Sequence, residues 1–258
     1  MNGTATDALV ARLHELRDVA APDLRPAVLP AIGLADRYAT LDTPLGPLYV
    51  AHNERGISSV MRAEDAADFE RTFQAGFGRP VFREPELPAE LLRSVERHLQ
   101  GKRSLRFDLR GLSEFEQAVL LKALEIPRGE IRPYSWIARE IGRPRAVRAV
   151  GTALARNPIP LFIPCHRVVR LDGTIGQYGL GGPANKRTIL SAEGIDLERV
   201  ERLARQGTRF VGSGTTHIYC LPTCRHARRI TPIHQQSFHS LEDAEAVGYR
   251  ACKVCRPA

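Results

Sequence analysis

Four cysteines near the end of the chain restrict its fold more than any other feature. They stand as Cys220-x3-Cys224 and, after 27 further residues, Cys252-x2-Cys255, whereas the fifth cysteine, Cys165, lies far from them. In an intracellular chain, paired cysteines at this spacing indicate a metal site and not disulfides. Four thiolates favour tetrahedral Zn²⁺ with Zn–S distances of about 2.3 Å. The sequence therefore predicts a small zinc-organised domain, for which a purely structural role is the commoner use.

The length allows one large domain or two smaller ones, and the charge predicts a polyanionic partner. The 258 residues of the chain are 43% hydrophobic, and no apolar run reaches the ~18 residues of a membrane span. The N-terminal residues lack the layout of a signal peptide, so we expect a cytoplasmic protein without a membrane partner. The net charge is +8. Residues 139–170 hold seven Arg and one Glu, which predicts a basic surface for a polyanion there.

The order of the predicted elements is typical of an α+β chain, with strands first and helices after them. Residues 6–20 have the spacing of an amphipathic helix, and Pro22, Pro26 and Pro30 follow as helix breakers. Residues 43–60 contain two strand-like runs joined by Asn-Glu-Arg-Gly, which predicts a hairpin.

Helical patterns dominate the middle of the chain. Residues 87–99 and 113–126 have helical spacing, and Ser113 and Glu116 form a capping-box pattern at the start of the second helix. Beyond Cys165 the chain is rich in glycine, and another helix then ends at Gly194. A charged stretch over residues 196–206 leads into the cysteine-rich end, and we place a domain boundary there.

A helix-turn-helix pattern lies between these helices and Cys165. Helices are predicted over residues 135–141 and 145–155, joined by a Gly-Arg-Pro turn. Arg145 and Arg148 fall near the start of the second helix, where such helices contact nucleic acid. A plain helical hairpin explains the pattern equally well, so the motif alone leaves DNA binding open.

The stretch NPIPLFIPCHRVV, residues 157–169, ends an apolar run on a lone cysteine. Buried cysteine usually acts as a small hydrophobic residue. However, His166 and Arg167 follow Cys165 directly, and a nucleophilic thiol needs a nearby proton acceptor and positive charge. Neighbouring residues seldom face each other along a strand, so a bend at Pro164 or a bridging water is required. Both interpretations, inert core residue and nucleophile, remain open at this point.

The segments GEIRPYSWIA, RAVRAVGTALARNPIPLFIPCHRVV and GQY…NKRTILSAEG resemble the O6-alkylguanine-DNA alkyltransferases in both order and spacing. The resemblance covers about residues 34–195. It implies that Cys165 irreversibly accepts the alkyl group, with His166 as its base through a water and Glu193 orienting the imidazole. Asn157 would tie the recognition helix to the active-site segment.

The same resemblance implies a monomer that repairs double-stranded DNA carrying O6-alkylguanine or O4-alkylthymine. The target nucleotide would be rotated out of the helix, because O6 is inaccessible within the stack. Tyr134 would press on the target phosphate, and Arg148 would fill the vacated space. The remaining residues implied to contact DNA or the base are Pro160, Val168, Tyr178 and Gly179. The loop between Tyr178 and Lys186 is one residue longer than the common family pattern, and residues 1–33 have no family counterpart.

Both cysteine pairs lie in stretches, TTHIYCLPTCRHARR and SLEDAEAVGYRACKVCRP, that resemble the zinc domain of Ada-type adaptive-response proteins. This second resemblance covers about residues 207–257. It implies that zinc-bound Cys220 takes methyl groups from DNA methylphosphotriesters, while Cys224, Cys252 and Cys255 only hold the metal.

The resemblance to the Ada-type domain also carries departures. The arginines implied to face the DNA backbone are Arg225, Arg228 and Arg229. His217 stands where the family usually has Gly, and the domain follows the alkyltransferase-like part instead of preceding it. We expect no transcription-factor role, because no second helix-turn-helix module is recognised. The neighbouring histidines expected at the surface, not on the metal, are His217, His226, His234 and His239.

The sequence thus predicts an N-terminal extension, a small α/β subdomain, a helical alkyltransferase domain with a helix-turn-helix, and a four-cysteine zinc domain. The predicted boundaries are 1–33, 34–110, 111–195 and 196–258. The leading function is single-turnover DNA dealkylation at Cys165, with phosphotriester repair at Cys220 as a second activity. Two alternatives stay open: a lesion-binding protein that does not repair, and a DNA-binding regulator in which zinc only folds the tail.

Overall fold

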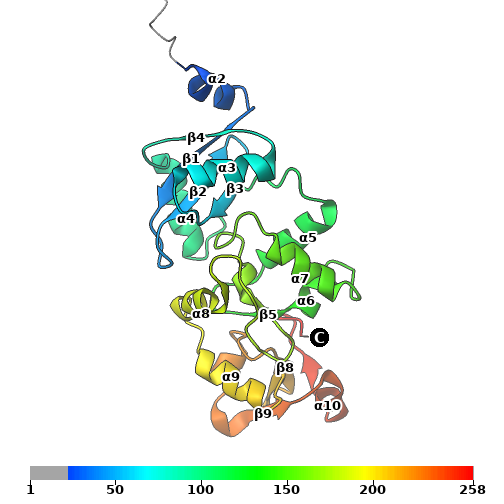
Figure 1. The fold of residues 1–258 in the computed structure, drawn as a ribbon. Helices are drawn as coiled ribbons and strands as arrows, with labels where there is room; N and C mark the ends of the chain where they lie inside the picture. Colours follow the sequence, from blue (N-terminus) through cyan, green and yellow to red (C-terminus); the bar gives the residue numbers. More distant parts are fainter. Residues whose placement is uncertain (1–22, 258) are drawn as a thin grey trace, which may run out of the picture.

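The computed structural model describes residues 23–257, in which three regions follow one another along the molecule in chain order (Figure 1). The helix predicted over residues 6–20 lies outside the described residues. The first described helix is α2 (Arg25–Ala31). Pro26 lies in its first turn, where a missing N–H breaks no helical hydrogen bond, so this proline starts a helix that the sequence pattern does not predict.

The first region is a four-stranded sheet with strand order β3-β2-β1-β4. Its elements are β1 (Asp36–Leu41), β2 (Leu48–Asn53), β3 (Gly56–Met61), α3 (Ala66–Phe77) and β4 (Val81–Arg83). β2 and β3 pair antiparallel, which confirms the predicted hairpin, whereas β1 and β4 are not predicted. Phe69 and Phe73 of α3 are fully buried in a cluster with Tyr38, so this helix covers one face of the sheet (Figure 1).

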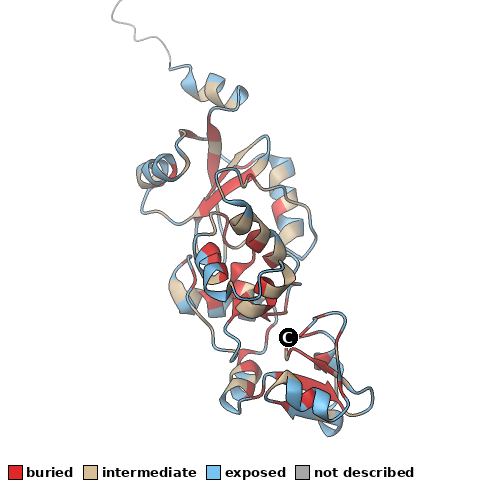
Figure 2. Ribbon diagram, turned by 90° about the vertical axis from the view of Figure 1, so that its right-hand side faces the viewer, coloured by how far each residue is buried: buried red, intermediate tan, exposed pale blue. Residues whose placement is uncertain are grey.

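The second region is mainly helical and contains both the helix-turn-helix and Cys165. Its elements are α4 (Ala89–Leu99), α5 (Glu114–Ala123), β5 (Arg132–Pro133), α6 (Tyr134–Glu140), α7 (Val147–Ala155), the 3₁₀ turn η1 (Cys165–Arg167), β6 (Val168–Val169) and α8 (Gly182–Ala192). The predicted helices are confirmed with ends shifted by a few residues, and the Ser113–Glu116 capping box is formed. Sheet and helices share one hydrophobic core, seen as the buried interior of these two regions in Figure 2.

The third region begins with a helix and continues as a second four-stranded sheet, with order β10-β8-β7-β9. Its elements are α9 (Leu197–Arg205), β7 (Phe210–Ser213), β8 (Ile218–Cys220), η2 (Ala227–Arg229), η3 (Pro232–His234), β9 (Gln235–Phe238), α10 (Leu241–Ala246) and β10 (Arg250–Ala251). The charged stretch at 196–206 is therefore an ordered helix, capped by Asp196. Leu197, Val200 and Leu203 recur at helical spacing and are buried. Within residues 23–257, no helix combines the length and apolarity needed to cross a lipid bilayer.

Candidate active site and metal centre

Cys165 is the first residue of the tight turn η1, not part of a strand. Pro164, with φ −80° and ψ 60°, turns the chain just before it. The bend expected at this proline is thus present, and it removes the strand geometry that would send adjacent side chains to opposite faces. The Cys165 residue is 7% exposed, so the thiol is almost enclosed.

The other two residues of this turn, His166 and Arg167, both contact the carboxylate of Glu193. His166 Nε2 lies 3.0 Å from Glu193 Oε1, and the Arg167 guanidinium donates to the same side chain at 2.7 and 2.9 Å. Arg167 also donates to the Ile126 carbonyl oxygen at 2.7 Å. The sequence interpretation that Arg167 stabilises a Cys165 thiolate is therefore wrong in its geometry: its charge is committed to Glu193.

The pKa shifts of Cys165, His166 and Glu193 indicate which of these groups are charged in the resting protein. Burial raises the pKa of the Cys165 thiol, although a hydrogen bond from Asn157 opposes this effect. Burial also lowers the pKa of His166, against the opposing influence of Glu193. Burial alone would raise the pKa of Glu193, but the hydrogen bonds from His166 and Arg167 outweigh it and lower that pKa to about 2. The resting site is accordingly a thiol, a neutral imidazole and a carboxylate.

Asn157 connects the end of α7 to the reactive sulfur. Its amide Nδ2 donates to Cys165 Sγ at 3.3 Å and to the Ile163 carbonyl oxygen at 3.0 Å, while its Oδ1 accepts from the Ile159 N–H at 3.0 Å. The Asn157 side chain therefore links the start of the apolar run, at Ile159, to its end, at Ile163 and Cys165.

Lys186 is a buried charge that the sequence reasoning did not single out. Only 1% of it is exposed, and its ammonium group donates to the Val168 carbonyl oxygen at 2.6 Å. Burial lowers its pKa to about 8, although the Cys165 sulfur opposes this shift. Its place in the quoted NKR segment is the only signal in the sequence that points to it.

A cavity of about 250 Å³ opens onto the Cys165 sulfur. Tyr134, Tyr178 and Gly179 line it, together with residues of α7 such as Gly151. Tyr178 also meets the His166 ring edge-on, with centroids 5.9 Å apart. Three of the six residues expected at the DNA and base site thus lie around one cavity with the thiol.

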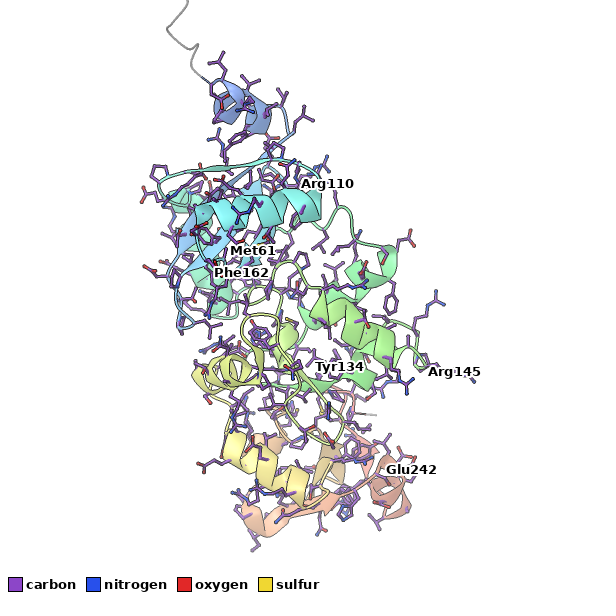
Figure 3. The ribbon with its side chains drawn as sticks, viewed as in Figure 1. Met61, Arg110, Tyr134, Arg145, Phe162 and Glu242 are labelled. Carbon is purple, nitrogen blue, oxygen red and sulfur yellow. The ribbon has the colours of Figure 1, made fainter. Side chains whose placement is uncertain are left out.

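The other three residues of that expected set lie outside this lining. Pro160 is buried in the segment before the turn, and Val168 is buried in β6, where it pairs with Arg132. Arg148 is exposed in the first turn of α7, as is Arg145 just before that helix. Figure 3 shows Arg145 pointing away from the body of the molecule, whereas Tyr134 is half-buried.

The four cysteines of the third region come together as the spacing predicts. Their Sγ atoms all lie within 4.8 Å of one another, and all four residues are buried. β8 and β10 are parallel neighbours. Cys220 is the last residue of β8 and Cys252 directly follows β10, so both cysteines lie at the same end of the two strands. The donor set fits a tetrahedral zinc site, since four thiolates are the usual ligands of such a site. Among the described residues, no histidine belongs to the cluster.

A second cavity, of about 550 Å³, adjoins this cluster on one side. Cys220 and Cys252 line it, whereas Cys224 and Cys255 do not. The lining of the cavity also includes five basic side chains, those of His226, Arg229, His234, Arg250 and Lys253.

The arginines and the histidine singled out by the sequence near this cluster lie in different environments. Of the three arginines implied to face DNA, only Arg229 lines the second cavity, while the backbone N–H of Arg225 donates to Glu130. His217, at the position where glycine is usual, has φ +50°. This left-handed conformation explains the preference for glycine.

Family models match almost the whole described chain. Residues 37–110 match the ribonuclease-like domain of 6-O-methylguanine DNA methyltransferase, and residues 114–195 match its DNA binding domain. Residues 200–258 match the metal binding domain of Ada.

The similarity to a second protein along most of that protein's length decides the family. The constitutive methylated-DNA–protein-cysteine methyltransferase of Bacillus subtilis is 35% identical over 167 residues, which are 63% of this chain and 95% of that protein. The chain belongs to the methylated-DNA–protein-cysteine methyltransferase family. The Escherichia coli bifunctional transcriptional activator/DNA repair enzyme Ada is 38% identical over 174 residues, but the chain spans only 48% of its length.

Solved structures of the family agree with the fold. Mycobacterium tuberculosis OGT in complex with DNA aligns with a TM-score of 0.52 and 32% identity, covering 64% of this chain and 99% of that one. The O6-methylguanine methyltransferase of the same organism aligns with the same TM-score at 34% identity. These alignments support the mixed α/β fold, to which the four-cysteine region is an addition in this chain.

Proposed function

We propose that this methyltransferase-family protein removes alkyl groups from O6-alkylguanine, and from O4-alkylthymine, in double-stranded DNA by transferring them irreversibly to Cys165. The observation that carries the proposal is a thiol at the base of a cavity, with a His–Glu–Arg hydrogen-bonded chain behind it. Each molecule acts once, because the thioether product has no return path, and the proposed acting form is a monomer.

The proposed chemistry assigns a role to each group. His166 is buried and neutral, and its Nδ1 has no hydrogen-bond partner among the residues the structure describes. It is free to accept the thiol proton, through a water, while Glu193 stabilises the imidazolium that results. Sulfur then attacks the alkyl carbon, the carbon–O6 bond breaks, and the departing guanine takes up a proton. Asn157 holds the sulfur on the cavity side throughout.

The helix-turn-helix supplies the DNA surface. O6 of guanine reaches Cys165 only after the nucleotide rotates out of the stack, at a cost of a few kcal/mol. Arg148 is exposed in the first turn of α7, and a planar guanidinium is suited to fill the space that the base leaves. Tyr134 lines the cavity that would receive the base, and its proposed role is to press on the target phosphate.

A second activity is proposed at Cys220: transfer of a methyl group from a DNA methylphosphotriester. Cys220 and Cys252 alone among the four sulfurs border the basic cavity, which restricts the choice of acceptor to these two. The resemblance to Ada-type domains favours Cys220. Bound zinc would keep this sulfur a thiolate at neutral pH, since a coordinating thiol is deprotonated.

Charge gives the second site its selectivity. Four thiolates around Zn²⁺ carry a formal charge of −2, which repels an ordinary phosphodiester but not a neutral methylphosphotriester. Methylation of Cys220 reduces this charge to −1, so methylated protein should bind DNA more tightly at low salt. If methylated and unmethylated forms have the same affinity at low salt, this switch does not exist.

One experiment separates the proposed function from its alternatives. The zinc-loaded protein is incubated with duplex DNA that carries O6-methylguanine or methylphosphotriesters, digested, and searched for methyl mass on each cysteine peptide. Label on both Cys165 and Cys220 supports two activities, and label on Cys165 alone leaves zinc with a structural role. No label on either would refute repair and leave a lesion-binding protein or a zinc-containing DNA-binding regulator.

A further inference from the structure

The loop between two zinc ligands is hydrogen-bonded to the alkyltransferase region. Thr223 lies between Cys220 and Cys224 and is only 5% exposed. Its hydroxyl accepts from the Ile131 N–H at 2.9 Å and lies 3.4 Å from the Ile131 carbonyl oxygen, to which it donates. One residue beyond Cys224, the N–H of Arg225 donates to the buried Glu130 carboxylate at 3.1 Å.

The other end of the zinc site contacts the first helix of the helix-turn-helix. The indole N–H of Trp136, on α6, donates to the carbonyl oxygen of the ligand Cys255 at 2.9 Å. Arg139 donates to the carbonyl oxygen of Arg256, whose own guanidinium pairs with Glu140. We call Thr223, Trp136, Arg139 and Arg256, with their partners, the zinc-domain interface.

This interface is adjacent to the strand that supports the reactive thiol. Ile131 directly precedes β5, and β5 pairs with β6 in the register Arg132–Val168. β6 begins immediately after the turn that holds Cys165, and Tyr134, the first residue of α6, directly follows β5. Cys165 and Tyr134 both line the first cavity, so the position of β5 affects both residues: Tyr134 directly, and Cys165 through the paired strand β6.

A two-residue strand has little stability of its own, because it makes few ladder hydrogen bonds. Its position depends on neighbouring contacts, and the zinc-domain interface supplies several of them through segments that contain metal ligands. Small tetrathiolate domains gain their folding free energy from the metal, so the positions of Thr223 and of the Cys255 carbonyl depend on zinc loading.

We propose that Thr223 and Trp136 are positioning residues that couple zinc loading to the alignment of β5 and hence to transfer at Cys165. The inference rests on the proposed activity at Cys165. It assigns the metal an effect on the O6-alkylguanine site in addition to any transfer at Cys220.

The test follows two signals in the full-length chain as zinc is removed by a chelator and restored. Trp136 is the only tryptophan, so its fluorescence reports the interface directly. Hydrogen exchange of the Ile131, Val168 and Val169 amides reports β5 and β6 without any DNA. Zinc removal should shift the fluorescence and lower amide protection by about tenfold or more, because it releases several contacts of the interface and one net hydrogen bond alone corresponds to about fivefold. The single-turnover rate of methyl transfer to Cys165 should fall by a similar factor.

Three variants separate positioning from general destabilisation. Thr223→Val keeps the shape of the side chain but removes both hydrogen bonds, and in zinc-loaded protein it should lower Ile131 protection and the Cys165 rate by about fivefold. Thr223→Ser keeps the hydroxyl and should restore both to within about twofold. Thr188→Val is the matched control, since this exposed threonine bonds only within α8.

Each outcome is decisive. If zinc removal or Thr223→Val leaves β5 and β6 protection unchanged, the proposal is wrong. It is also wrong if protection falls while the Cys165 rate stays constant, because the contact would then be structural only. If no form of the protein transfers methyl groups, the proposed function fails, and the exchange data still decide whether zinc loading positions the strand.

Discussion

The Cys165 site and the four-cysteine site contain the same reactive atom in different electrostatic surroundings. Cys165 is a lone thiol whose pKa is raised by burial, so the proposed transfer would require a base when substrate arrives. The proposed base is His166, which lies 3.0 Å from the Glu193 carboxylate, and Arg167 in turn donates to that carboxylate. The site therefore depends on several side chains from η1 and the end of α8.

The four-cysteine site would need no such base. Its sulfurs lie within 4.8 Å of one another, so Cys220, Cys224, Cys252 and Cys255 would hold a Zn²⁺ ion, and the ion would keep each coordinating sulfur deprotonated. In the proposed function the negative charge of the zinc–thiolate cluster selects a neutral methylphosphotriester, and five basic side chains line the cavity beside the cluster. The two proposed sites would make sulfur nucleophilic in different ways: one moves a proton at the moment of reaction, and the other coordinates a metal in advance.

The largest effect should come from exchanging each acceptor for alanine in turn. Cys165→Ala should abolish methyl transfer from O6-methylguanine and leave zinc content unchanged, because this thiol lies outside the cluster. Cys220→Ala should remove transfer from methylphosphotriesters. Peptide mass spectrometry and zinc analysis measure both. Persistent O6-methylguanine repair in the Cys165→Ala protein would contradict the whole assignment.

Removal of the carboxylate behind His166 should affect one site only. In Glu193→Gln the imidazolium loses its stabilising charge, so transfer to Cys165 should slow by about 100-fold. Transfer to Cys220 should not change, because it needs no imidazole. Single-turnover rates at the two cysteines provide the measurement. Glu201→Gln, which disrupts a more exposed pair with Arg187, is the matched control. Equal slowing at both cysteines would indicate general damage instead.

The same carboxylate should contribute to acid stability. The pKa of Glu193 is lowered from 4.5 to about 2 in the folded protein, so its contribution is fully present above pH 4.5 and is lost as the pH falls toward 2. A shift of this size corresponds to about 3 kcal/mol. Urea unfolding from pH 2 to 6 should show a weaker pH dependence for Glu193→Gln than for the wild type. Identical slopes would mean that the pair contributes nothing to folding.

The smallest effect should appear at alkaline pH and involves Lys186. Its pKa is lowered from 10.5 to about 8, so between these values the folded protein releases a proton that the unfolded chain keeps. Stability should therefore rise with pH, by about 1 to 2 kcal/mol between pH 8 and about 9.5, because the full contribution of about 3 kcal/mol is reached only above pH 10.5. Lys186→Met should abolish the rise in urea unfolding curves, whereas Lys102→Met, at an exposed position, should retain it. A rise that persists in Lys186→Met would assign it to another group.

Local patterns predict the elements around both sites well. The hairpin, the capping box at Ser113, the helix-turn-helix and the four-cysteine cluster all follow from short-range spacing, and all are present. The helix at 197–205 carries an equally clear apolar spacing, but its many charges favour a linker interpretation. β1 and β4 are not predicted, since their pairing is set by partners distant in the sequence.

Residue types and spacing alone single out the candidates for the proposed chemistry: a lone cysteine followed by histidine, and two cysteine pairs at metal-binding spacing. The surroundings of these residues come from the tertiary structure. It directed Arg167 to Glu193 instead of the thiol, buried Lys186 behind β6, and joined Thr223 of the zinc loop to Ile131, 92 positions away. Spacing along a chain fixes local geometry, whereas contacts between distant segments depend on how whole elements pack, which no short pattern contains.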